Sequence, residues 1–205
     1  DNSGFIDMAE KFGFGEKIYL ANGITSYSGN LQNGEDISIP AEKANMSFGQ
    51  GKLTATPLQI ARMTTIIANG GFCPEITVIK GTVENEKITY KTKSPSERVI
   101  EFETSYKLRK FMEYSVNNEN SNARPFNTTA AGKTSTAQTG IFDENGDEIL
   151  QAWFTGYFPI DNPRYIVTVF IEDGNTGNSS AAPVFKEIAE KITILENEQI
   201  AERVY

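Results

Sequence analysis

The chain has 205 residues, of which 39% are apolar, so it suits one domain or one and a half with a sizeable hydrophobic core. Its formal charge of −8 argues against a nucleic-acid partner, because phosphate binding needs a basic surface. It has no histidine, which excludes Ser-His, Cys-His and His-metal chemistry, so catalysis would rest on Ser, Thr, Lys, Tyr or carboxylate side chains.

Two helices and a long loop region are predicted in the first third of the chain. Residues 1–12 carry apolar side chains at the spacing of one helical face, and a glycine follows as a stop. Residues 13–52 contain many glycines and few periodic runs, which indicates a loop region with short elements. The clearest helix follows Thr56, a typical N-cap, has a proline in its first turn and ends at the Asn-Gly-Gly of residues 69–71.

A β-hairpin and another helix are predicted in the middle of the chain. The single Cys73 cannot form an internal disulfide, and its neighbours indicate a buried, small apolar residue. Residues 76–83 and 87–92 alternate in polarity around a Glu-Asn-Glu-Lys turn, which is typical of a hairpin. Residues 105–116 have helical periodicity. The residues expected on the inner side of this helix are Leu108, Phe111, Met112 and Ser115.

The last third predicts three strands and a closing helix. The strands are expected at residues 129–138, 151–157 and 165–172, with turns at DENGDE and PIDNP. The helix begins at Pro183, and its inner side is expected to carry Val184, Ile188 and Ile192. Helices first, then an antiparallel meander, then a helix is an α+β pattern, an antiparallel sheet flanked by helices.

The stretch AAGKTSTAQTG, residues 130–140, places one lysine among small polar residues. A phosphate loop ending in Gly-Lys-Thr would need a glycine at position 127, which is Asn127, with an apolar strand before it and a helix after it. These requirements are not met, so the phosphate loop is rejected. An ordinary polar edge strand and an anion-binding strand of an acyl-transfer site both remain.

Five segments share their order and spacing with one known family. They are FGFGE (12–16), MSFGQGKLTATPLQIARMTTIIANGG (46–71), KTST (133–136), QAWFTGYFPIDNPRYIVTVFIED (151–173) and AAPVFKEIAEKI (181–192). They resemble the Gly-Gln-Gly loop, the Thr-Pro-Leu-Gln helix, the Lys-Thr-Gly-Thr strand and the neighbouring elements of penicillin-binding proteins, the D,D-transpeptidases that crosslink peptidoglycan. The agreement runs from about residue 5 to residue 195 and is best for the high-molecular-weight type without a glycosyltransferase domain.

The resemblance implies roles for four residues. Lys133 would supply a cation for the carboxylate of a D-Ala-D-Ala peptide or a β-lactam, and Thr134 and Thr136 would line the strand beside which the substrate adds. The Thr136 backbone N–H would be one oxyanion donor. Ser135 stands where the family has glycine, so its hydroxymethyl group narrows the site, adds a donor, or points to the other face at little cost.

Two family motifs are missing from this chain. No serine is followed by a lysine three residues later, so the Ser-x-x-Lys nucleophile and base are absent. Ser-x-N occurs at Ser28 and Ser115, and we interpret both as chance matches. We therefore expect residues 1–205 to be the C-terminal portion of a single transpeptidase domain that lacks its upstream strands and nucleophile helix, and to be inactive alone.

The sequence thus predicts part of a serine D,D-transpeptidase that needs no cofactor or metal. The alternatives are a non-catalytic sensor or scaffold of the same fold and a β-lactam-hydrolysing relative. The expected partners are the peptidoglycan stem peptide and β-lactams. Without the upstream strands, the apolar strand at residues 165–173 would be an open edge, and a dimer through it is expected. No run here could span a bilayer and no signal peptide is visible, so we expect a soluble piece of an extracytoplasmic, membrane-anchored parent.

Overall fold

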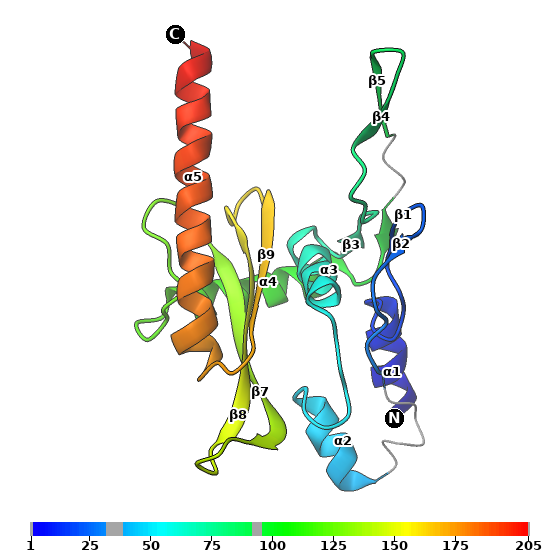
Figure 1. Cartoon of the computed structure of the whole chain (residues 1–205), viewed down its shortest axis with the longest axis vertical. Coiled ribbons are helices and arrows are strands. Elements are labelled where there is room, and N and C mark those ends of the chain that lie inside the picture. The colour runs from blue at the N-terminus through cyan, green and yellow to red at the C-terminus, as the bar shows by residue number, and fades with distance from the viewer. Residues whose placement is uncertain (1, 32–38, 92–95, 205) are drawn as a thin grey trace. The chain divides into compact units, whose positions relative to one another are not determined.

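The structure is a computed structural model that describes residues 2–31, 39–91 and 96–204. The chain divides into two compact units, Asp1–Phe102 and Glu103–Tyr205 (Figure 1). Both combine helices with antiparallel strands, so the α+β class expected from the sequence is confirmed.

The first unit contains the three N-terminal helices. Their bounds are α1, Asn2–Lys11; α2, Pro40–Ser47; and α3, Pro57–Ala68. The helices predicted for residues 1–12 and after Thr56 are therefore confirmed. The predicted loop region holds α2 and a short strand pair, β1 (Tyr19–Ala21) with β2 (Ile24–Thr25), and its residues 32–38 lie outside the described part.

Two further strand pairs complete the first unit. They are β3 (Phe72–Cys73) with β6 (Glu97–Arg98), and β4 (Gly81–Glu84) with β5 (Lys87–Tyr90). The predicted hairpin is confirmed, but its strands are shorter than expected, and residue 92 lies outside the described part. Asn85 and Glu86 both have positive φ, as a tight two-residue hairpin turn requires. Cys73 is only half-buried, so the expectation of full burial was wrong.

The second unit is built on a three-stranded antiparallel sheet. Its strands are β7 (Ala131–Phe142), β8 (Glu148–Phe158) and β9 (Tyr165–Ile171), in the order β7-β8-β9. All three predicted strands are confirmed. The β7–β8 hairpin extends beyond both predicted strands, to Phe142 and Glu148, because the turn closes only at residues 143–147.

Helix α4, Phe102–Asn117, confirms the predicted helix, but its inner side is rotated from the predicted one. Met112 is buried as expected, and Leu108 and Ser115 are half-buried. Phe111, also expected inside, is 70% exposed, and Val116 is buried instead. Arg109 explains the rotation: its guanidinium donates to the Ile160 carbonyl at 2.8 Å. A polar side chain therefore occupies the inner side, and a hydrophobicity pattern cannot reveal that arrangement.

Helix α5, Ala182–Val204, follows a π-helical turn, η2, at Gly177–Ala181. Val184, expected inside, is 38% exposed, whereas Phe185 and Ala189 are fully buried. Ile192, also expected inside, packs against the core cluster, and Ile188 is half-buried, so the predicted inner side is confirmed in part.

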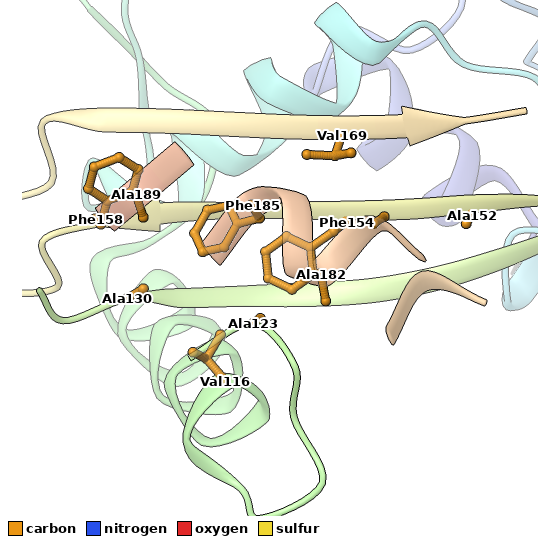
Figure 2. Close-up of a cluster of buried hydrophobic side chains, with 11 residues drawn as sticks. Val116, Ala123, Ala130, Ala152, Phe154, Phe158, Val169, Ala182, Phe185 and Ala189 are labelled. Atoms are coloured by element: carbon orange, nitrogen blue, oxygen red, sulfur yellow. The ribbon is translucent and has the colours of Figure 1, made fainter. Parts of the chain in front are cut away.

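The core of the second unit lies between α5, α4 and the sheet (Figure 2). The Phe185 ring packs against Phe154 at 4.5 Å and against Phe158 at 6.0 Å between ring centroids. The buried cluster consists of Val116, Ala123, Ala130, Ala152, Phe154, Phe158, Val169, Ala181, Ala182, Phe185 and Ala189. This core fixes the sheet from one face and leaves part of the other face for the site.

Candidate functional site

The four residues predicted to form the site lie together on β7. Lys133 and Ser135 share one face of the strand and are exposed, while Thr134 and Thr136 share the other face and are half-buried. Their cross-strand partners on β8 are known from the register: Lys133 pairs with Thr155 and Ser135 with Trp153. Within the described residues, β7 pairs only with β8, so it forms one edge of the sheet.

The small residues before Lys133 have a packing role. A Cβ at Gly132 would lie 2.4 Å from the Phe154 ring and 2.7 Å from the Thr155 carbonyl oxygen. A Cβ at Gly156, the partner of Gly132, would lie 2.7 Å from the Ala131 carbonyl oxygen. Only glycine fits at these two positions, so the start of β7 lies directly against the aromatic core.

The η2 turn supports the middle of β7 from the core side. The Gly177 amide donates to Thr136 Oγ1 at 3.1 Å. A Cβ at Gly177 would lie 2.5 Å from the Ser135 carbonyl oxygen and 2.5 Å from that of Trp153. The strand segment that carries the predicted site is therefore held by close backbone contact.

Lys133 presents a cation on the open side of the strand. Its ammonium donates to the neighbouring Thr134 carbonyl at 2.7 Å. No described carboxylate forms an ion pair with it. An ammonium has three N–H donors, so this one can still bind an anionic ligand.

The face that carries Lys133 and Ser135 continues across the sheet. The Trp153 ring contacts the Phe170 ring at 4.3 Å between centroids. Trp153 is half-buried, whereas Phe154, on the opposite face of β8, is buried in the core. Burial raises the pKa of Tyr157, and the Arg109 guanidinium, 3.4 Å from its hydroxyl, partly opposes that shift.

Gln59 is a buried polar residue whose role the sequence reasoning missed. Its side-chain amide donates to the carbonyls of Gly13 at 3.1 Å, Glu16 at 3.2 Å and Ser28 at 2.7 Å. Its Oε1 accepts from the Thr56 amide at 2.9 Å, which completes a capping box at the start of α3. The Thr-x-x-Gln spacing at a helix start was the available signal, and it indicated the cap but not the distant carbonyls.

The FGFGE loop also contacts Arg62 of α3. Gly13 has a φ of +87°, and a Cβ there would lie 2.4 Å from the Arg62 guanidinium, so glycine is required. Arg62 Nε is buried without a hydrogen-bond partner.

In the Gly-Gln-Gly segment, Gly49 and Gly51 both have positive φ, and the backbone amide of Gln50 donates to the Asn45 carbonyl at 2.9 Å.

The two Ser-x-N matches lie in different surroundings. The Ser28 hydroxyl donates to the adjacent Gly29 carbonyl at 3.1 Å, and Ser115 is half-buried in α4.

Within residues 2–31, 39–91 and 96–204, no three His, Cys, Asp or Glu side chains cluster as metal ligands would. In the same ranges, no helix has both the length and the apolar character needed to cross a membrane.

Residues 2–190 match the family model of the penicillin binding protein transpeptidase domain. The chain belongs to this family. It is 32% identical over 203 residues to penicillin-binding protein PbpB of Mycolicibacterium smegmatis, covering 90% of this chain and 31% of that protein. It is also 32% identical over 170 residues to the peptidoglycan D,D-transpeptidase MrdA of Haemophilus influenzae, covering 73% of this chain and 25% of MrdA.

Solved structures of similar proteins have the same fold. Penicillin binding protein 3 of Mycobacterium tuberculosis, complexed with ampicillin, matches with a TM-score of 0.78 and 28% identity, covering 94% of this chain and 46% of that one. A peptidoglycan synthetase of Bifidobacterium adolescentis matches with a TM-score of 0.82 and 24% identity, covering 96% and 36%. The family and the high-molecular-weight type inferred from the sequence are confirmed. The chain spans less than a third of the two curated relatives named above.

Proposed function

We propose that residues 1–205 are the C-terminal portion of the transpeptidase domain of a peptidoglycan D,D-transpeptidase, and that β7 is its ligand-binding strand. The observation that carries this proposal is Lys133. It is an exposed cation without a carboxylate partner among the described residues, on an edge strand supported from behind by Gly177. A site that binds a ligand carboxylate needs such a cation.

Each residue of the strand has a distinct proposed role. Lys133 binds the carboxylate of the stem peptide or of a β-lactam, and Thr134 and Thr136 line the strand beside which the ligand extends. The Thr136 N–H donates to the oxyanion of the tetrahedral intermediate. β-Lactam binding is supported by one relative, penicillin binding protein 3 of Mycobacterium tuberculosis, whose structures were solved with ampicillin and with aztreonam.

The serine nucleophile and its lysine base belong to a part of the parent protein outside these 205 residues, because no serine here has a lysine three residues later. The serine would attack the carbonyl of the penultimate D-Ala and expel the terminal D-Ala as the leaving group. The acyl group would then pass to the amine of a second stem peptide. We propose an extracytoplasmic, membrane-anchored parent in which this reaction takes place.

The test is acylation by benzylpenicillin, followed by intact-mass spectrometry. We expect no adduct on the 205-residue chain and one adduct on the full-length protein. Lys133→Ala in the full-length protein should lower the acylation rate roughly 10- to 150-fold, because a hydrogen bond to a charged group contributes about 1.5–3 kcal/mol.

Lys107→Ala is the matched control. Lys107 is an exposed lysine of the same unit, and its ion pair with Glu103 lies within α4. Because such exposed pairs contribute little, its acylation rate should match the wild type. An adduct on the isolated chain would overturn the proposed position of the nucleophile. A full-length protein that forms no adduct would favour a non-catalytic sensor or scaffold of the same fold.

A further inference from the structure

Ser135 lies on the ligand face of β7, not on the core face. Alternation along the strand places it on the face of Lys133, and its side chain is exposed. The core face at this position is filled by Gly177, whose Cβ, if present, would lie 2.5 Å from the Ser135 carbonyl oxygen and 2.8 Å from the Ser135 nitrogen. The Ser135 backbone is thus held in place, and its hydroxyl points to the open side.

The Ser135 hydroxyl has no competing partner among the described residues. Within the part of the chain that the structure describes, it forms no hydrogen bond, and the residue opposite it is Trp153, whose ring packs on Phe170. The Ser135 hydroxyl is therefore a free donor that lies between the Trp153–Phe170 ring pair and the Lys133 ammonium. That combination suits a ligand with a carboxylate beside an apolar group.

We propose that the Ser135 hydroxyl is a specificity-determining donor that binds the ligand carboxylate together with Lys133; this inference rests on the proposed function. Residues two apart on a strand are separated by roughly 6.5 Å along it, a span that a carboxylate with a hydrogen bond of about 2.8 Å on either side can bridge. A carboxylate has about four acceptor sites, so it can accept from the Lys133 ammonium and the Ser135 hydroxyl at once.

The experiment compares benzylpenicillin with its uncharged methyl ester on the full-length protein. Ser135→Ala removes the hydroxyl, Ser135→Gly also removes the Cβ, and Ser135→Thr keeps a hydroxyl. We expect the Ala and Gly variants to be acylated roughly 10-fold more slowly than wild type by the acid, the lower end of the effect of a hydrogen bond to a charged group, and the Thr variant to retain most of the rate. With the ester, whose uncharged carbonyl is a weaker acceptor than a carboxylate, the losses of the Ala and Gly variants should be clearly smaller.

Other results would overturn the proposal. Faster acylation of Ser135→Gly with an unchanged Ser135→Ala rate would mean that the side chain only restricts space. An equal loss with acid and ester would mean that the hydroxyl does not act on the carboxylate. Ser96→Ala, at an exposed serine of the other unit, is the control and should change neither rate.

Lys133→Ala separates this inference from the proposed function. If Lys133→Ala lowers the rate with the acid and Ser135→Ala does not, only the role of Ser135 is wrong. If neither variant changes the rate, β7 is not the carboxylate-binding strand, and both proposals are wrong.

Discussion

Gln59 joins three segments of the first unit through one side chain. It is fully buried, and its amide satisfies three carbonyls, two in the loop at residues 13–16 and one at Ser28. Buried carbonyls and amides that lose their partners carry a desolvation penalty. The loop conformation and the start of α3 therefore depend on the same residue.

Gln59→Leu keeps a similar volume but removes these hydrogen bonds. We expect the free energy of unfolding to fall by about 2 to 4 kcal/mol, measured by urea denaturation, because several buried polar groups lose their partner. The control is Gln138→Leu, since Gln138 is exposed and its amide donates to Glu148. If both substitutions had the same small effect, the carbonyls around Gln59 would have found other partners.

Gly132→Ala tests the close contact behind the site. Its Cβ would meet the Phe154 ring at 2.4 Å, so we expect thermal denaturation to show a loss of about 1–3 kcal/mol from overpacking. Gly4→Ala is the control: Gly4 lies in α1 with nothing within 4 Å of its Cβ position. It should stabilise the helix by up to about 1 kcal/mol. An unchanged melting temperature for Gly132→Ala would contradict the packing role of that glycine.

At the scale of the elements, the β7–β8 hairpin depends on the aspartate that opens its turn. Asp143 Oδ1 accepts from the amides of Asn145 and Asp147, both at 2.9 Å, and Gly146 adopts a φ of +86°. The Asp147 amide, with the other backbone donors of the turn, lowers the pKa of Asp143. The ionised form is therefore favoured in the folded state.

The stability of this turn should depend on pH. Because the pKa of Asp143 is lower in the folded state, its contribution is full above the unfolded value of about 3.9 and is lost as the pH falls through the folded value. We expect Asp143→Asn to be less stable than wild type at pH 7, with a difference that shrinks below about pH 4 in urea denaturation. A difference that is constant with pH would contradict this role, and Glu144→Gln in the same turn is the control.

At the scale of the whole molecule, β9 is the second edge of the three-stranded sheet. Among the described residues it pairs only with β8, and its sequence, YIVTVFI, is largely apolar. Unpaired N–H and C=O groups on such a strand favour association with another chain. Sedimentation of the 205-residue chain should therefore show concentration-dependent dimers, with β9 amides protected from hydrogen exchange. A monomer at all concentrations, with β9 amides that exchange fully, would contradict this prediction.

The sequence by itself determined the class of fold, the main helices and strands, and the family. Local signals were sufficient because a cap such as Thr56, a helical period and an alternating strand act within a few residues. The motif around Lys133 was recognisable for the same reason, since its residue types and spacing are local properties.

Only the tertiary structure decided which sides of α4 and α5 face inward, because that depends on segments far apart in the chain. Arg109 lies on the inner side of α4 because its guanidinium donates to the carbonyl of Ile160, 51 residues later in the chain. Phe185 lies on the inner side of α5 because Gly156 of the facing strand has no side chain to exclude its ring. Gln59 likewise connects distant segments, because its side chain donates to carbonyls of residues up to 46 positions away in the sequence. The exposure of Ser135 required the same information, because Gly177 closes the opposite face. Packing between distant segments is a property of the folded chain, which local patterns cannot specify.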